Sequence, residues 1–411
     1  MKETHEILLE RYTQIIARIG MNVQADDWVS LAAPLDAAPF VRVLARTLYQ
    51  MGAAYVDVGW QDELTERERL LHAAENHLQL VPQYRVQRVH EHLDRRSVRL
   101  NIYAEDPLVY ADVPPERVAA QRRAFSEAMR DAYVRMGEVN PRWLVVSYPV
   151  AAWARRVFPD VPTEQAVAQL WDTIFTLCRC RHDDPVAAWQ AHVADLNRRA
   201  DYLNARRYRS LHFHGGGTDL LIGLADSHRW EGANSVDAQG LSFVPNIPTE
   251  EVFTAPHRER ITGVIASTKP YAYAGNLIEG ATFRFEDGRV VNHDAKRGLD
   301  LLTRLLDQDE GARSLGEVAL VPHSSPVGQA GLLFYNVLYD ENAACHIAFG
   351  RAYEISVEGG AGKTLRELAH LGLNESLVHE DFMVGSAELN VDGIHDDGRV
   401  EPLLRAGEWA F

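Results

Sequence analysis

Residues 28–60 read WVSLAAPLDAAPFVRVLARTLYQMGAAYVDVGW, and this stretch indicates the architecture of the N-terminal half of the chain. It opens with a short apolar run at 28–33, continues with apolar residues at helical spacing from Pro39 to Met51, and ends with a strand-like run at 54–60. A helix between two short apolar strands is typical of a parallel sheet, because parallel strands need a crossover connection. The stretch therefore predicts a doubly wound α/β fold.

The same alternation extends to both sides of this stretch. Apolar residues recur at helical spacing over residues 5–19, before the first strand-like run. Further strand-like runs and amphipathic helical patterns follow at 97–104, 115–136, 143–149, 163–179 and 185–205. We therefore expect residues 1–207 to form an α/β domain with a mostly parallel sheet.

The pattern changes after Arg207 and becomes rich in strands. Residues 211–224 are strand-like and contain three consecutive glycines, and residues 282–293 contain an Asp-Gly pair between alternating residues, which is a strong hairpin signal. One charged helical pattern occurs at 294–308. Further strand-like runs occur at 318–322, 343–350, 352–359 and 382–394. We expect residues 208–411 to form a β-rich α+β domain.

The composition is that of a globular protein with more than one domain. The 411 residues exceed the size of one ordinary core, and the chain is 46% hydrophobic and 24% charged. Its 42 basic and 58 acidic residues give a formal net charge of −16. That balance argues against a nucleic-acid surface, which needs a basic face, and it suits chemistry on peptides or small molecules.

The sequence also predicts the compartment. The charged N-terminal residues lack the apolar core of a signal peptide, and the chain contains no apolar run long enough to span a membrane. Its three cysteines are too few for a disulfide framework and fit a reducing environment. We expect a cytoplasmic protein without membrane or nucleic-acid partners.

Several familiar site motifs are absent or incomplete. The sequence has no Gly-x-Ser-x-Gly elbow, no P-loop and no His-Glu-x-x-His. The glycines of 212–219 lack the lysine and the following helix of a phosphate loop, so a bulge or tight turn is the better interpretation. Cys178 and Cys180 have no second pair to complete a zinc site and indicate a helix end. The histidines within 72–77 and 90–94 indicate solvated helix faces.

Metal-competent residues of the second half lie beside apolar strand-like runs rather than on charged helical faces. They occur in NIPTEEVFTAP (246–256), GEVALVP (316–322), YDENAACHIAFGRAY (339–353) and NESLVHEDFMVG (374–385). The candidates are Glu250, Glu251, Glu317, Asp340, Glu341, His346, Tyr353, His379 and Asp381.

Each candidate has an ordinary structural interpretation when it is considered alone. Together they favour a metal centre, since carboxylates and imidazoles buried beside apolar strands need compensation, which bound cations supply. His379 and Asp381 point to the same side of a strand. Two glutamates, two histidines and one aspartate can hold two divalent ions if one carboxylate bridges them. Such ligands suit Zn²⁺, Co²⁺ or Mn²⁺, and the absence of cysteine ligands argues against a closed structural zinc.

The four segments resemble, in this order, the motifs of the aminopeptidase T and aminopeptidase S family of co-catalytic metallopeptidases. Residues 200–224 and the Gly-Glu-Trp of 407–409 agree with this resemblance. The resemblance implies an α/β N-terminal domain, a β-rich C-terminal domain that carries two metal ions, and a homodimer. The metal ligands that it implies are Glu251, Glu317, His346, His379 and Asp381.

Further roles follow from the resemblance. Tyr353 is the expected hydrogen-bond donor in the active site, and Glu250 is a candidate general base or contact for the substrate amine. Asp340 and Glu341 are expected to orient the histidines. The implied reaction is release of the N-terminal amino acid from peptides with a free N-terminus, by a water molecule that two metal ions activate.

Two other classes of function compete with this one. A mononuclear Fe(II) ring-cleaving dioxygenase on a related scaffold would use His346, His379 and Asp381 as its facial triad, but it would leave Glu251 and Glu317 without a role. A non-catalytic peptide- or metal-binding protein would not need Tyr353 in addition to the full ligand set.

Overall fold

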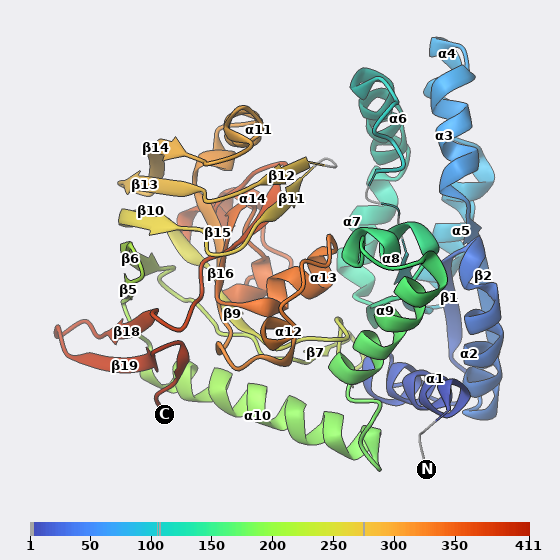
Figure 1. Cartoon of the computed structure of the whole chain (residues 1–411), viewed down its shortest axis with the longest axis horizontal. Helices are drawn as coiled ribbons and strands as arrows, with labels where there is room; N and C mark the ends of the chain where they lie inside the picture. Colours follow the sequence, from blue (N-terminus) through green and yellow to red (C-terminus); the bar gives the residue numbers. More distant parts are fainter. Residues whose placement is uncertain (1–3, 105, 107, 274–275) are drawn as a thin grey trace. The chain divides into compact units, whose positions relative to one another are not determined.

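The computed structural model describes residues 4–104, 106, 108–273 and 276–411, and Figure 1 labels its helices and strands where there is room. Contacts divide the chain into two compact units, Met1–Ala191 with Asn234–Ile247, and His192–Ala233 with Pro248–Phe411. The domain boundary expected between residues 207 and 208 stays a prediction.

The division into these two units does not coincide with that boundary, for two local reasons. The side chain of Asn204 exchanges hydrogen bonds with the backbone of Trp230, which ties the end of a long helix to the second unit. Residues 234–247 return to the first unit, because the backbone N–H of Val145 donates to Pro245 and the N–H of Ile247 donates to Val145.

The first unit contains the predicted parallel sheet. Its strands run in the order β2-β1-β3-β4, and every pair is parallel. Side chains of β1 alternate between buried and half-buried positions, as expected for a strand with one better-covered face. The strands are β1 (Trp28–Pro34), β2 (Tyr55–Gln61), β3 (Val98–Tyr103) and β4 (Trp143–Ser147).

The helices of this part of the chain follow the predicted pattern with one correction. The single helix expected at 115–136 is two helices, because the backbone at Met129 leaves the helical region (φ −93°, ψ 0°). The helices are α1 (His5–Ile15), α2 (Ala38–Gln50), α3 (Glu63–His72), α4 (Glu75–Leu78), α5 (Gln83–Asp94), α6 (Pro115–Ala128), α7 (Arg130–Val139), α8 (Ala151–Val157), α9 (Thr163–Leu177) and α10 (Pro185–Arg206). A π-helical turn (Ile16–Gly20) follows α1, and a short β7–β8 ribbon (Ser235–Val236 and Ser242–Phe243) belongs to the returning segment.

The second unit is built on an eight-stranded antiparallel sheet of order β14-β13-β10-β6-β5-β18-β19-β20. Both glycine-containing turns are confirmed as hairpins: β5–β6 turns through the three glycines, and β13–β14 turns through Asp287 and Gly288, both at positive φ. The strands are β5 (Ser210–Gly215), β6 (Thr218–Leu224), β10 (Pro256–Ala266), β13 (Thr282–Glu286), β14 (Arg289–Asp294), β18 (Asn390–Ile394), β19 (Val400–Arg405) and β20 (Glu408–Trp409).

A second, four-stranded antiparallel sheet of order β17-β16-β15-β9 carries four of the nine candidate residues, Glu317, His346, His379 and Asp381. One of its faces packs on the large sheet: the ring of Phe283 in β13 lies 4.7 Å from that of Phe349 and 5.3 Å from that of Phe382. The strands are β9 (Val252–Thr254), β15 (Leu315–Leu320), β16 (His346–Gly350) and β17 (His379–Met383). The remaining elements are the β11–β12 ribbon (Tyr271–Tyr273 and Asn276–Ile278), α11 (Leu299–Leu306), α12 (Pro326–Gln329), α13 (Val337–Asp340) and α14 (Leu365–His370).

Three further sequence predictions need correction in this unit. The strand expected at 352–359 contains only a 3-10 turn (Glu354–Ser356), because Gly350 adopts φ 97° and turns the chain out of the sheet. The strand expected at 382–394 is two strands, β17 and β18, in different sheets. The helix expected at 294–308 is confined to α11. In the described part of the chain, no helix is both long and apolar enough to cross a membrane.

Candidate metal centre

Strand register brings the candidate ligands to one side of the four-stranded sheet. In the ladder Glu317 of β15 lies opposite Ala348 of β16, and Ala348 lies opposite Asp381 of β17. Their neighbours Val318, Ile347 and Phe382 belong to the hydrophobic core. The alternation of a strand therefore separates a core-facing side from a ligand-bearing side. The small side chain of Ala348 leaves space between the two carboxylates.

His346 is the centre of a first group of ligand atoms. Its Nε2 lies 3.0 Å from Glu251 Oε2, 3.5 Å from Glu317 Oε1 and 3.9 Å from Asp381 Oδ1. The imidazole is only 1% exposed. Two ligands held at about 2.0–2.1 Å from a tetrahedral ion are roughly 3.3 Å apart, so these spacings fit ligands of a shared cation.

His379 is the centre of a second group, which shares a residue with the first. Its Nε2 lies 3.8 Å from Glu317 Oε2 and 3.8 Å from Asp381 Oδ1. The potential ligand sets are therefore Glu251, Glu317 and His346, and Glu317, His379 and Asp381. Glu317 directs one oxygen towards each imidazole, so this residue could serve both ligand groups if two cations were bound.

The hydrogen bonds of the two histidines prepare both Nε2 atoms for a metal. Nδ1 of His346 donates to the carbonyl of Ala344 at 3.2 Å, and Nδ1 of His379 donates to the carbonyl of Arg351 at 2.7 Å. A ligating histidine commonly donates its other ring N–H to a carbonyl, which fixes the tautomer and the ring orientation. The lone pair of each Nε2 then faces the carboxylates.

The carboxylates also fit a cation. Within the described residues, the buried Glu251 Oε2 and Asp381 Oδ1 have no hydrogen-bond partner. Burial raises the pKa of Glu317 despite the opposing effect of His346 and His379, so the ionised carboxylate needs more positive charge than the histidines provide. Divalent ions bound by these residues would give the two carboxylate oxygens a partner and would supply the positive charge that Glu317 needs.

Tyr353 lies beside the second group. Its ring is 4.6 Å from that of His379, and the residue is 41% exposed. Burial of the hydroxyl, together with the charges of Glu317 and Asp381, raises the pKa of Tyr353 well above its usual value. The hydroxyl therefore stays protonated at neutral pH and can donate a hydrogen bond.

Glu250 points to a different environment from Glu251. Its Oε2 lies 3.6 Å from Nε2 of His192, and its backbone N–H donates to Asn342 at 2.6 Å. The side chain lines a cavity of about 340 Å³ together with His192, Arg199, Ser324 and Trp409, among others. The potential ligand sets contain Glu251 and not Glu250.

The two acidic residues before β16 have different surroundings. The carboxylate of Asp340 accepts the backbone N–H groups of Phe334 at 2.8 Å and Asn336 at 3.0 Å, so it fixes a loop and orients neither histidine. Glu341 is close enough to the centre for its charges to act on it: burial, followed by the charges of Glu251 and Asp381, raises its pKa well above the usual range. Only an orienting role could be predicted for Glu341, because Glu251 and Asp381 are distant from it in the sequence.

The fold and this centre define a class of protein. A buried set of three carboxylates and two imidazoles, with one carboxylate shared and cysteine absent from both groups, is the ligand chemistry of a hydrolase that uses divalent metal ions.

Comparisons with known proteins identify the family. The model of the thermophilic metalloprotease family (M29) matches residues 5–409. Aminopeptidase T of Thermus thermophilus is 44% identical and Aminopeptidase 2 of Geobacillus stearothermophilus is 43% identical, each over 98% of both chains. The structure of wild-type AmpT from Thermus thermophilus is similar, with a TM-score of 0.93, 42% identity, and coverage of 99% of this chain and 100% of that one. The chain belongs to the thermophilic metalloprotease family M29, and it is a metallopeptidase.

Proposed function

We propose that this protein is a metal-dependent aminopeptidase that releases the N-terminal amino acid from peptides. The observation that carries the proposal is the position of Glu317, whose two oxygens face the imidazoles of His346 and His379. A shared carboxylate between two ligand groups suits a pair of metal ions rather than one. Membership of a metalloprotease family, and relatives that are called aminopeptidases, support the same activity.

The proposed metal ligands are Glu251, Glu317, His346, His379 and Asp381, and the proposed ions are two of Zn²⁺, Co²⁺ or Mn²⁺. When bound, such ions polarise the scissile carbonyl and lower the pKa of a water molecule towards neutrality.

Residues of the chain supply the remaining chemistry. The protonated hydroxyl of Tyr353 donates a hydrogen bond to the oxyanion that forms at the scissile carbonyl. An ionised carboxylate accepts the proton of the attacking water and, once protonated, passes it to the leaving amine. The sequence predicts Glu250 for this role. Glu341 competes for it, because its carboxyl group lies near Glu251 and Asp381.

Acidic side chains also account for the preference for a free N-terminus. The α-amino group of a peptide is cationic at neutral pH, and a carboxylate such as Glu250 can pair with it. Binding of that amine would restrict cleavage to the first residue. The protein is further proposed to act as a homodimer in the cytoplasm, with domains 1–207 and 208–411.

The decisive experiment measures hydrolysis of leucine p-nitroanilide by the purified protein before and after exhaustive chelation. Zn²⁺, Co²⁺, Mn²⁺ and Fe²⁺ are then added back singly. Loss of activity on chelation and recovery with Zn²⁺, Co²⁺ or Mn²⁺ supports the proposal. Absence of hydrolysis with every metal, combined with tight Fe²⁺ binding, would instead favour the dioxygenase.

A further inference from the structure

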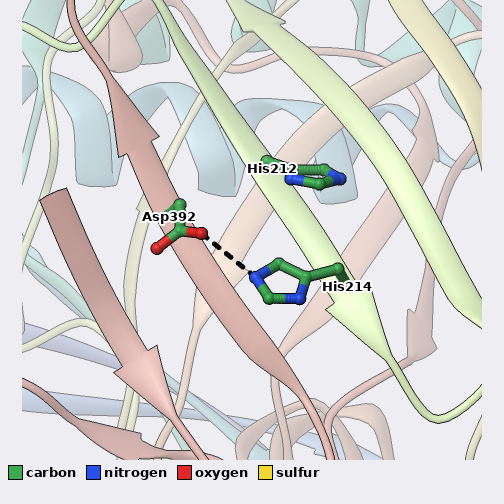
Figure 2. A group of neighbouring side chains, drawn as sticks. All are labelled: His212, His214 and Asp392. Carbon is green, nitrogen blue, oxygen red and sulfur yellow. Dashed lines mark hydrogen bonds and ion pairs between the residues drawn. The ribbon is translucent and has the colours of Figure 1, made fainter. Parts of the chain in front are cut away.

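A second group of metal-competent residues lies on the eight-stranded sheet. His212 and His214 project from the same face of β5, and Asp392 of the neighbouring strand β18 lies directly opposite His212 in the ladder. The two imidazoles stack with their centroids 4.9 Å apart and their planes 29° apart. Figure 2 shows the two rings and the carboxylate gathered around one place on the sheet.

The distances within this group fit a single ion. One ligand atom from each of the three residues lies within 4.8 Å of the other two. Nε2 of His214 is 3.0 Å from Asp392 Oδ2, close to the roughly 3.3 Å that separates two ligands of a tetrahedral Zn²⁺. An ion can therefore replace the proton between these two atoms with little movement, since metal binding to histidine releases protons.

Outer partners hold two of the three side chains in place. Nε2 of His212 lies 2.7 Å from Asp219 Oδ1, and this hydrogen bond leaves Nδ1 with the lone pair. Arg405 binds Asp392 Oδ1 at 2.5 Å, so Oδ2 is the oxygen that faces His214. An imidazole whose far nitrogen is held by a carboxylate is the usual arrangement around a bound metal.

Access and charge favour a cation at this position. The side chain of Asp392 is 12% exposed, whereas both imidazole side chains are 36% exposed, so solvent ions can reach the histidines while the carboxylate lies mostly below the surface. Asp392 pairs with Arg405, and the exposed Asp219 adds a second carboxylate beside His212. Because His212 and His214 face the same side of β5, the strand itself sets two imidazoles beside one carboxylate of β18, and these three side chains can share one cation.

We propose that His212, His214 and Asp392 bind one divalent transition-metal ion of the kind that imidazole and carboxylate prefer, such as Zn²⁺. This site shares no residue with the centre on the four-stranded sheet. By joining β5 to β18, the ion would link two strands that are distant in the sequence. The proposal does not depend on the proposed peptidase activity.

The test compares Zn²⁺ stoichiometry by equilibrium dialysis and elemental analysis of chelated full-length protein. The double variant H212Q/H214Q keeps polar groups that can bond to Asp219 and Asp392 but removes both imidazoles. We expect it to bind one equivalent less than the wild type. Hydrolysis of leucine p-nitroanilide, with the centre saturated, should be unchanged. The matched control H72Q/H77Q removes two exposed histidines of α3 and α4 and should retain the full stoichiometry.

Milder variants keep the test decisive if the double variant does not fold. D219N leaves all three proposed ligands in place. It should lower the affinity for the additional Zn²⁺ ion by about 10–100-fold, as for other partners of ligating histidines. The single variants H212Q and H214Q should each lower this affinity more than D219N does. Equal stoichiometry and affinity in the wild type and in the folded variants would overturn the proposal and leave only His–Asp hydrogen bonds at this position.

Discussion

The Nε2 of His346 lies 3.0 Å from Oε2 of Glu251, although Glu251 directly precedes β9 and His346 begins β16, two strands that are not paired with each other. Strand β15 lies between β9, which begins just after Glu251, and β16, which begins at His346. Strand β15 contributes Glu317. Because β15 lies between β9 and β16, the strand order places the carboxylate of Glu317 next to both Glu251 and His346.

The first prediction concerns this contact. Glu251→Gln removes the negative charge but keeps the shape of the side chain. We expect the variant to lose metal and at least about 100-fold in kcat/KM, because the ligand set no longer balances the ion's charge. Elemental analysis and the rate of leucine p-nitroanilide hydrolysis measure the two effects. The exposed Glu310→Gln is the control; unchanged metal content in Glu251→Gln would remove Glu251 from the ligand set.

The second prediction concerns the hydroxyl beside His379. Tyr353→Phe should lower kcat by about 10²–10³-fold, as for removal of one oxyanion donor. KM and metal content should stay close to those of the wild type, since the hydroxyl is not among the proposed ligands. Tyr84→Phe, at an exposed position of α5, is the control. Full activity in Tyr353→Phe would exclude the oxyanion role.

The third prediction separates the two candidates for proton transfer. Glu341→Gln should reduce kcat by about 10²–10⁴-fold, which is the contribution of a general acid–base group. Glu250→Gln should affect kcat less, because its carboxylate faces His192. Steady-state kinetics of both variants, at equal metal content, measure the difference. The reverse order of effects would assign the proton transfer to Glu250.

The fourth prediction concerns pH-dependent stability at Glu231. Burial raises the pKa of this carboxyl group to about 7, although the ion pair with Arg229 acts in the opposite direction. A raised folded-state pKa means that the stability it contributes is complete below the unfolded value of about 4.3 and is lost as the pH rises through 7. Glu231→Gln should therefore be more stable than the wild type at pH 8, by about 1–3 kcal/mol, and similar to it at pH 4.

Urea unfolding at both pH values measures that difference. The exposed Glu286→Gln serves as the control. An equal effect of Glu231→Gln at pH 4 and pH 8 would contradict the assignment to ionisation.

The fifth prediction concerns the loop that leads into β17. Burial opposes ionisation of Asp309, but hydrogen bonds from the backbone of Leu377 at 2.6 Å and the hydroxyl of Ser376 at 2.8 Å outweigh it and lower the pKa. The lowered pKa contributes stability above the unfolded value of about 3.9, and this stability is lost as the pH falls through the folded value.

Asp309→Ala should consequently destabilise the protein by about 1–3 kcal/mol at pH 7, because it leaves these donors unpaired. The difference in stability between this variant and the wild type should shrink below about pH 4. Thermal unfolding of both proteins between pH 3 and pH 7 measures this difference. A difference that is constant with pH would show that the charge of Asp309 is not what stabilises the loop.

Much of the fold was predictable because it depends on local periodicity. The apolar runs that became β1 and β2 and the helical spacing between them specify a strand–helix–strand unit without reference to distant residues. Local patterns failed where a single residue ended an element: Met129 divides the long helix, and Gly350 turns the chain out of β16 before the strand expected at 352–359.

The sequence alone identifies the residues that can bind metal, because histidine and carboxylate side chains carry nitrogen and oxygen donor atoms wherever they lie in the fold. The sequence alone does not show which of these donor atoms lie close together. Glu251 rather than Glu250 lies in the ligand groups, Glu317 is shared, and Asp392 lies opposite His212, because of strand order and register. Register between distant strands is set by packing of the whole unit, and a shift of one residue would turn these side chains to the opposite face.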